Sequence, residues 1–332
     1  MEVRGWIDGD ESGREMLSRL LTDRPYMHLP PPFHKLPVRV GNVVELVGPS
    51  PSAKTTILMH SAIDCILPQF WNGVHYGGFG HLVFFIDLDC RFDVLRLSHM
   101  LKNRIILANR SSNCNAESKS NTDYDEELFL ASMKRFIYIR CYDSFEFLAT
   151  LKTLHHQLQK EKDAQGIRLN FMMIDSIGAF HWTDRSSMSL NCQDNNRKSI
   201  SLQNVTITVV EEIKKLLLVH PMIVIATKAT ILGNRYAANE VKWNLKRPHS
   251  MDSAASSVTN SMQQFLHREY MPLVWQSFVT LRVLIRTAGS ADDHIVTDKN
   301  CNKCVYFSEW LLPSLGFADK FVVEDAGIFC AS

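Results

Sequence analysis

Residues 43–56 read Val-Val-Glu-Leu-Val-Gly-Pro-Ser-Pro-Ser-Ala-Lys-Thr-Thr, and this stretch decides the fold. It keeps most of the phosphate-binding loop pattern, in which a glycine is followed after four residues by Gly-Lys and then Ser or Thr. Gly48, Lys54 and Thr55 are in register, whereas Ala53 stands where the second glycine belongs. The stretch therefore predicts a nucleotide phosphate site, built on an altered loop.

The segments on either side of the loop predict an α/β fold. A β-type apolar run leads into it and a helical apolar run leads out, which is the strand–loop–helix context that the motif requires. Strand-type and helical segments then alternate, and continuous apolar runs are typical of buried parallel strands. We expect strands at 43–47, 81–87, 136–141, 168–175, 222–227, 276–286 and 305–312. We expect helices at 57–67, 92–107, 143–158 and 205–219.

The loop should bind phosphate less well than an intact one. Backbone N–H groups of such a loop surround the phosphates, its lysine adds charge and its hydroxyl holds Mg²⁺. Pro51 has no N–H to offer, and a side chain at Ala53 in the left-handed region costs roughly 1–2 kcal/mol. We expect weakened binding, with γ-phosphate chemistry more affected; a strand–turn–helix with a fortuitous Lys-Thr pair is the alternative. The predicted nucleotide-binding residues are Gly48, Ser52, Ala53, Lys54, Thr55 and Thr56.

Carboxylates end two of the predicted strands. Asp175 closes one apolar strand and is predicted to hold Mg²⁺ together with Thr55; the alternative is a helix cap. Asp87 and Asp89 end another, and Asp89 is the candidate for orienting an attacking water, with a turn residue as the alternative. Aspartate is one methylene shorter than glutamate, and a 1 Å misplacement can cost on the order of 100-fold in rate. The carboxyl ends of parallel strands meet at one edge, so all three elements should converge.

The composition of the chain limits the classes of protein to which it can belong. The chain has 332 residues, 45% hydrophobic, with a net charge of +1, so any contact with nucleic acid must be local. No apolar run approaches the ~18–20 residues that span a bilayer, and the start of the chain is not that of a secretory signal. Eight scattered cysteines fit a reducing intracellular compartment. Cys301 and Cys304 form a lone C-x-x-C without a second pair to complete a zinc site.

The chain divides into three predicted parts. A short helix near residues 11–21 is either core packing or a docking element for a partner. Polar composition marks loops at 184–204 and within the core insertions. The parts are an N-terminal arm and linker (1–40), a core (41–290, with insertions near 109–127 and 232–262) and C-terminal strands (291–332).

Three segments resemble the RecA-type recombinase paralogues: residues 48–55, 85–97 and 173–185. The similarity extends over roughly residues 10–230. It implies a RecA-like phosphate-loop ATPase core, with a mostly parallel central sheet flanked by helices, and ATP and Mg²⁺ as cofactors. It also implies a nuclear mediator subunit of homologous recombination and double-strand break repair. The implied partners are other recombinase paralogues (the D-type nearest), the recombinase filament, and single-stranded or branched DNA, with no membrane.

This sequence departs from the pattern of active recombinases at three positions. Those proteins carry glycine where Ala53 stands, glutamate where Asp89 stands and a phosphate-sensing glutamine where Ala229 stands. These losses favour a nucleotide-binding subunit with weak or no turnover. The alternative is a DNA-stimulated ATPase in its own right, and a small-molecule kinase would need a lid and a base-binding signature that the sequence lacks.

The insertion at 232–262 combines basic and aromatic residues. Basic side chains that meet phosphates, interleaved with aromatic side chains that stack on bases, suit single-stranded DNA, and in the RecA family the equivalent region is a DNA-facing loop. A solvated loop is the alternative. The predicted DNA-binding residues are Arg235, Lys242, Lys246 and Arg247, with Tyr236 and Trp243 between them.

Overall fold

The computed structural model describes most of the predicted core. The described residues are 12–23, 26–112, 125–165, 169–190, 202–232, 267–287 and 304–331. Within them, no helix has both the length and the apolar character needed to cross a membrane.

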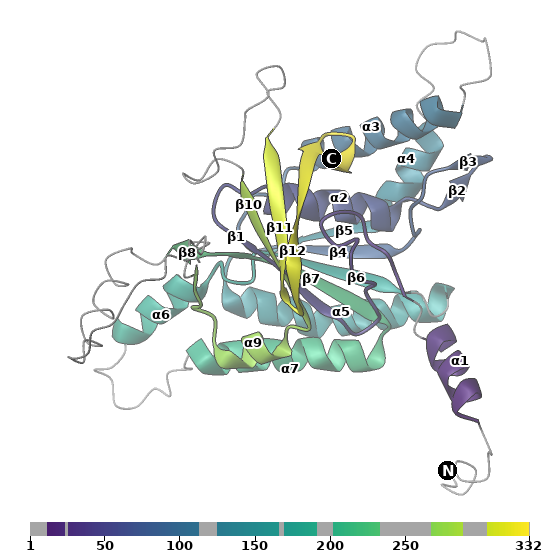
Figure 1. The fold of residues 1–332 in the computed structure, drawn as a ribbon. Helices are drawn as coiled ribbons and strands as arrows, with labels where there is room; N and C mark the ends of the chain where they lie inside the picture. Colours follow the sequence, from purple (N-terminus) through teal and green to yellow (C-terminus); the bar gives the residue numbers. More distant parts are fainter. Residues whose placement is uncertain are drawn as a thin grey trace, which may run out of the picture.

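A nine-stranded sheet forms the centre of the molecule (Figure 1). Its order is β13-β12-β11-β10-β1-β7-β6-β4-β5, and the six strands from β10 to β5 are mutually parallel. The three C-terminal strands continue the same sheet in antiparallel fashion. The strands are β1 (Val43–Gly48), β4 (Leu82–Asp87), β5 (Phe136–Arg140), β6 (Asn170–Asp175), β7 (Met222–Ala229), β10 (Leu281–Thr287), β11 (Val305–Leu312), β12 (Ser314–Glu324) and β13 (Gly327–Cys330).

Helices cover both faces of the sheet (Figure 1). One face is packed by α2 (Lys54–Ile66), α3 (Val94–Ser112) and α4 (Glu126–Met133), and the other by α5 (Ser144–Gln165), α7 (Leu202–Val219) and α9 (Leu273–Phe278). The inner strands are buried on both faces, which is why most of their residues are apolar. The α/β class and the mostly parallel sheet flanked by helices are confirmed. The other elements are α1 (Gly13–Asp23), α6 (His181–Leu190), β2 (Phe70–Trp71), β3 (Val74–His75), β8 (Ile231–Leu232) and β9 (His267–Arg268).

Three expected segments differ from the structure. The strand expected at 276–286 begins within α9, a short helix with one buried face, on which Trp275 is fully buried while Leu273 is 75% exposed. Part of the loop expected at 184–204 belongs to α6. The inward side of this helix carries the polar residues His181 and Asp184, so no apolar period marked the helix in the sequence.

Helices occupy both described ends of the insertion expected at 109–127. The helix α3 runs on to Ser112, and α4 begins at Glu126, where Asp125 caps it by accepting from the Leu128 N–H at 2.9 Å. The residues between 112 and 125 lie outside the described part, as do residues 233–266 of the second insertion. The polar composition therefore concealed the helical ends of this insertion.

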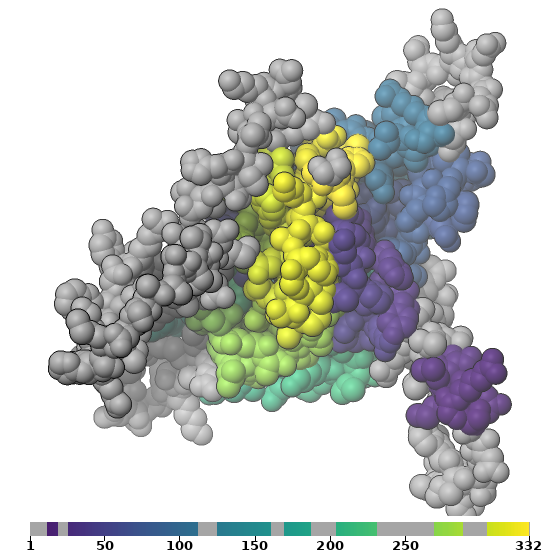
Figure 2. Space-filling model, in the orientation of Figure 1, coloured from purple at the N-terminus to yellow at the C-terminus, as the bar shows by residue number. Residues whose placement is uncertain are grey.

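The segment before the first strand joins the core. Leu29, Phe33 and Val38 are fully buried in the cluster beneath α2 and α3. The Lys35 ammonium lies 3.2 Å from an oxygen of Asp319 in β12, and Figure 2 shows the C-terminal strands beside the early part of the chain. The segment that precedes β1 thus lies against the C-terminal strands on one surface.

The helix α1 does not contribute to the core through its first turns. Met16 is 50% exposed and Leu17 57% exposed, and Figure 1 shows α1 projecting from the body. The expectation of core packing is wrong for these two side chains. Ser12 and Glu15 form a capping box at its start, with the Glu15 N–H donating to the Ser12 hydroxyl at 3.2 Å.

Candidate functional site

Four parallel strands end at the same edge of the sheet and bring the predicted residues together. The loop 49–53 follows β1, Asp89 follows β4, Asp175 ends β6 and Thr227 lies near the end of β7. The Leu88 and Asp89 N–H groups both donate to the Asp175 carbonyl, at 2.7 and 3.1 Å. The predicted convergence of these elements is therefore present.

Ala53 adopts the left-handed conformation expected of the missing glycine. Its φ and ψ are 55° and 15°, directly before the first residue of α2. Gly48 is required for a different reason: a Cβ there would lie 2.5 Å from the Ile285 carbonyl oxygen of β10 and 2.7 Å from the Ser52 hydroxyl. Close packing against β10 thus leaves room only for glycine at position 48, whereas the start of α2 requires the left-handed backbone at Ala53.

The Lys54 side chain folds back over the loop. Its ammonium donates to the carbonyls of Gly48 (2.8 Å) and Pro49 (2.9 Å) and to the Ser52 hydroxyl (3.0 Å). Burial lowers the pKa of Lys54 to about 8, against the smaller opposing effect of Asp175. An anionic ligand could replace these three neutral acceptors, because the ammonium forms a stronger hydrogen bond with a charged oxygen than with a neutral one.

Asp175 carries an oxygen that is free for a ligand. Thr227 donates its hydroxyl to Oδ1, while the buried Oδ2 has no hydrogen-bond partner among the residues that the structure describes. Burial raises the pKa of Asp175, and hydrogen bonds from Thr227 and Thr55 oppose that rise. The effect of Thr55 on the pKa of Asp175 shows that the two predicted Mg²⁺ ligands lie close together. Hydroxyl and carboxylate oxygens are the ligands that Mg²⁺ prefers, so this pair fits the ion.

Asp87 and Asp89 have different surroundings. Asp87 is buried and accepts hydrogen bonds from the Tyr138 hydroxyl (3.0 Å) and from the Phe92 N–H (3.3 Å), so it organises the turn after β4. Asp89 is half-buried, and burial together with the charge of Asp175 raises its pKa. Asp89 is therefore the carboxylate that borders the phosphate loop.

The end of β7 holds one residue that the sequence analysis named, Ala229, and one that it did not, Lys228. Ala229, expected to replace a sensing glutamine, pairs in register with Gly48, so this position does adjoin the phosphate loop. The neighbouring Lys228 is buried on the other face, with its ammonium 3.2 Å from Glu45 and 2.6 Å from Glu269. A lysine within an apolar strand was the available signal, because a buried charge requires partners.

Some of the remaining predicted residues are described by the structure, and others fall outside the described residues. Ser52 is buried beneath Lys54, and Thr56 lies in the first turn of α2. The predicted DNA-binding residues Arg235, Lys242, Lys246 and Arg247 lie outside the described residues. Of the C-x-x-C pair, Cys304 is exposed and free, and Cys301 is outside the described part.

Comparison with known proteins identifies the family. The chain is 51% identical, over 338 aligned positions, to the DNA repair protein XRCC2 homolog of Arabidopsis thaliana, which covers 98% of this chain and 89% of that protein. The chain belongs to the XRCC2 family. A second family member, DNA repair protein XRCC2 of Mus musculus, is 26% identical over 325 positions, covering 96% of this chain and 97% of that one. No general family model matches the chain.

Proposed function

We propose that this XRCC2-family chain is a nucleotide-binding subunit of a heteromeric complex of RecA-family paralogues. The complex acts in the nucleus, in homologous recombination and repair of double-strand breaks, and assists assembly of the recombinase filament on single-stranded DNA. Both relatives named above are DNA repair proteins, which supports the repair role. The D-type paralogue is the nearest expected partner, by resemblance of the three sequence segments described above.

The observation that carries nucleotide binding is the meeting of Lys54, Thr55 and Asp175 at one sheet edge. Lys54 would exchange its loop carbonyls for the outer phosphates, and Thr55 with Asp175 would hold Mg²⁺. The unpaired Oδ2 of Asp175 supports this assignment, because a buried carboxylate oxygen is expected to have a partner. The arrangement supports a RecA-like phosphate-loop core.

Two features of the loop, Pro51 and the contacts of Lys54, should weaken nucleotide binding, whereas the conformation of Ala53 should not. Pro51 still lacks an N–H, and Lys54 must give up three hydrogen bonds to reach a phosphate. Ala53 adopts the left-handed conformation that the loop requires where it enters α2. We expect the cost of this conformation to fall on folding and not on nucleotide affinity.

Turnover is expected to be slow. Asp89 is one methylene shorter than the glutamate it replaces, and a misplacement near 1 Å can cost on the order of 100-fold in rate. The second candidate, a DNA-stimulated ATPase, is favoured by one observation: Asp89 lies beside Asp175, with its N–H on the Asp175 carbonyl. Steady-state hydrolysis with and without single-stranded DNA separates the two candidates.

Calorimetry of the purified complex with Mg²⁺–ATP tests the proposal. Wild-type protein should bind, and Lys54→Ala should lose binding while remaining folded and associated with its partners. Lys215→Ala is the matched control, because Lys215 lies on the exposed surface of α7 and contacts Glu212. The absence of nucleotide uptake by the wild type at millimolar ligand would contradict the proposal, and robust hydrolysis lost in Lys54→Ala would favour the ATPase.

A further inference from the structure

The turn after β4, residues 88–92, holds Arg91 at the nucleotide edge of the sheet. The first two N–H groups of the turn donate to the Asp175 carbonyl. The N–H groups of Arg91 and Phe92 donate to the two oxygens of the Asp87 carboxylate, at 3.4 and 3.3 Å. The backbone of the turn is therefore anchored at both ends on the acids that end β4 and β6, at the edge where the phosphate loop lies.

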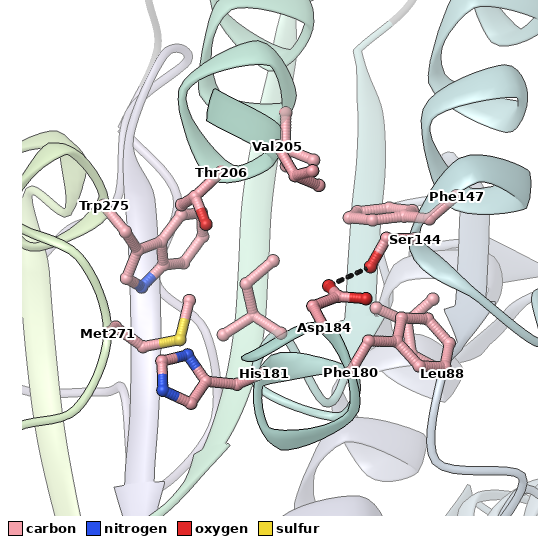
Figure 3. Close-up of a pocket in the computed structure, with 12 residues that line it drawn as sticks. Leu88, Ser144, Phe147, Phe180, His181, Asp184, Val205, Thr206, Met271 and Trp275 are labelled. Atoms are coloured by element: carbon pink, nitrogen blue, oxygen red, sulfur yellow. Dashed lines mark hydrogen bonds between the residues drawn. The ribbon is translucent and has the colours of Figure 1, made fainter. Parts of the chain in front are cut away.

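Side chains also hold this turn in place. Leu88 is 3% exposed and lines the pocket between α5, α6 and α7 (Figure 3). Phe92 stacks on Tyr138, with the ring centres 4.7 Å apart. Cys90 has a φ of 56°, and a residue with a side chain keeps this left-handed conformation only where its surroundings impose it. The exposed Arg91 side chain therefore extends from a backbone whose place is fixed.

Arg91 lies near enough to the lysine of the phosphate loop for their charges to interact. Burial is the main cause of the lowered pKa of Lys54, and the charge of Arg91 lowers it further. Burial and the charge of Asp175 raise the pKa of Asp89, whereas the charges of Arg91 and Lys54 lower it. The two cations and Asp89 therefore belong to one electrostatic site. Like charges that lie near each other repel, so a ligand with several negative charges gains from binding both cations.

The charge balance at this edge gives Arg91 a part in any binding of a further anion. Three carboxyl groups, those of Asp87, Asp89 and Asp175, stand against two cations. Lys54 already donates to three acceptors of the loop, whereas the Arg91 guanidinium has no hydrogen bond or ion pair with another residue that the structure describes. A guanidinium offers a planar fork of N–H donors that matches two oxygens of a phosphate. Arg91 is therefore the cation available to an incoming phosphate.

We propose that Arg91 binds the terminal phosphate of a nucleoside triphosphate, as a second cation beside Lys54. The same turn carries Asp89, the candidate for orienting a water at that phosphate, so both side chains belong to the outer end of the triphosphate. The guanidinium supplies charged hydrogen bonds to a loop in which Pro51 offers no N–H. The site should therefore prefer a triphosphate to a diphosphate. This inference rests on the proposed nucleotide site and adds which nucleotide that site takes.

Photolabelling of the purified complex measures nucleotide binding on this chain alone. The complex is irradiated with Mg²⁺ and an azido derivative of ATP or of ADP, and gel electrophoresis then separates this chain from its partners. Arg91→Gln should raise the half-saturating concentration of the ATP derivative about 10- to 100-fold, the range expected when one hydrogen bond to a charged group is lost. The value for the ADP derivative should change much less, because a diphosphate lacks the phosphate that Arg91 binds. Arg91→Lys should keep part of the affinity, since it retains the charge but not the fork.

Arg140→Gln is the matched control. Arg140 is an exposed arginine at the end of β5, and its guanidinium donates to the Cys90 sulfur of the same turn at 3.1 Å. Its replacement removes one positive charge from this edge of the sheet and one contact from the turn. An effect of general charge or of a distorted turn should therefore appear in both variants, whereas a direct contact with phosphate should appear only in Arg91→Gln. Association with the partner subunits confirms that each variant is folded.

The possible results separate failure of this inference from failure of the proposed function. A wild-type complex in which this chain takes up neither label would overturn the nucleotide site, and the role of Arg91 with it. Wild-type labelling whose preference for ATP over ADP is unchanged in Arg91→Gln overturns the role of Arg91 alone. Equal losses in Arg91→Gln and Arg140→Gln would assign the effect to the turn and also overturn that role.

Discussion

Replacement of Lys228 by methionine should strongly destabilise the fold. Lys228 is 2% exposed and Glu45 fully buried, and the Lys228 ammonium lies 3.2 Å from Glu45 and 2.6 Å from Glu269. Glu45 also accepts from Arg282 at 2.5 Å and from the Trp275 indole at 2.7 Å. The two acids and two bases balance in charge, so Lys228→Met leaves one buried negative charge in excess.

The expected loss of stability depends on the partners that Glu45 keeps after the substitution. Removing one partner of a buried ion pair costs about 3–5 kcal/mol, because the other charge is left uncompensated. Glu45 keeps Arg282 and Trp275, which places Lys228→Met near the lower end, at about 3 kcal/mol. At roughly 2–4 °C per kcal/mol for a domain of this size, Tm should fall by about 6–12 °C.

Urea unfolding of the two single variants and the double variant provides the assay. Glu45→Gln removes the buried charge that Lys228 compensates, so Lys228→Met with Glu45→Gln should lose at least about 1 kcal/mol less than the sum of the singles. Lys215→Met is the control: that side chain is 66% exposed, and its surface pair with Glu212 should contribute little to stability. Strictly additive losses, or a Lys228→Met variant as stable as the control, would refute the reasoning.

Three further changes test other parts of the structure. Ala53→Gly relieves roughly 1–2 kcal/mol of left-handed strain in the folded state, but the freer backbone stabilises the unfolded state by about 0.4–1 kcal/mol. The variant should therefore have a slightly higher urea midpoint and an unchanged Kd for nucleotide. Thr227→Val removes the hydroxyl bonded to Asp175, which should cost about 1–3 kcal/mol at pH 7 and weaken Mg²⁺-dependent nucleotide binding in calorimetry. Burial raises the pKa of Asp64 to about 6, above its unfolded value, so the folded state binds the proton more tightly and stability should fall as pH rises from about 4 to 6. Asp64→Asn should flatten that part of a urea-midpoint profile measured from pH 4 to 8, and an unchanged profile would contradict the role of this carboxyl.

The sequence predicted the parts of the fold that depend on local pattern. The strands expected at 81–87 and 168–175 are recognisable because burial on both faces leaves their central residues, 83–86 and 171–174, entirely apolar. The meeting of Lys54, Thr55 and Asp175 was predictable because parallel strands share one carboxyl edge. The left-handed Ala53 followed from the motif, since the loop geometry requires that conformation whichever residue occupies the position.

Features that depend on distant contacts could not be predicted. Lys228 pairs with Glu45 and Glu269, which come from other parts of the chain, and no local period marks such a pairing. Neither ring nitrogen of His181 has a hydrogen-bond partner among the described residues, and this too depends on what surrounds the ring and not on a local pattern. The short polar helix α6 that carries His181 reads as a loop in the sequence. The burial spacing of α9 was obscured because its apolar residues run directly into those of β10.

The position of β1 has a consequence for synthesis of the chain. This strand is among the first to leave the ribosome, yet both of its neighbours, β7 and β10, belong to the last third of the sequence. Long-range pairing of this kind is slow and leaves apolar edges open while translation continues. Gly48 contacts β10 directly, so the phosphate loop acquires its final shape only after residue 285 has been made. A product that stops before β10 would keep β1 as an uncovered apolar edge, and we expect chaperones to retain it.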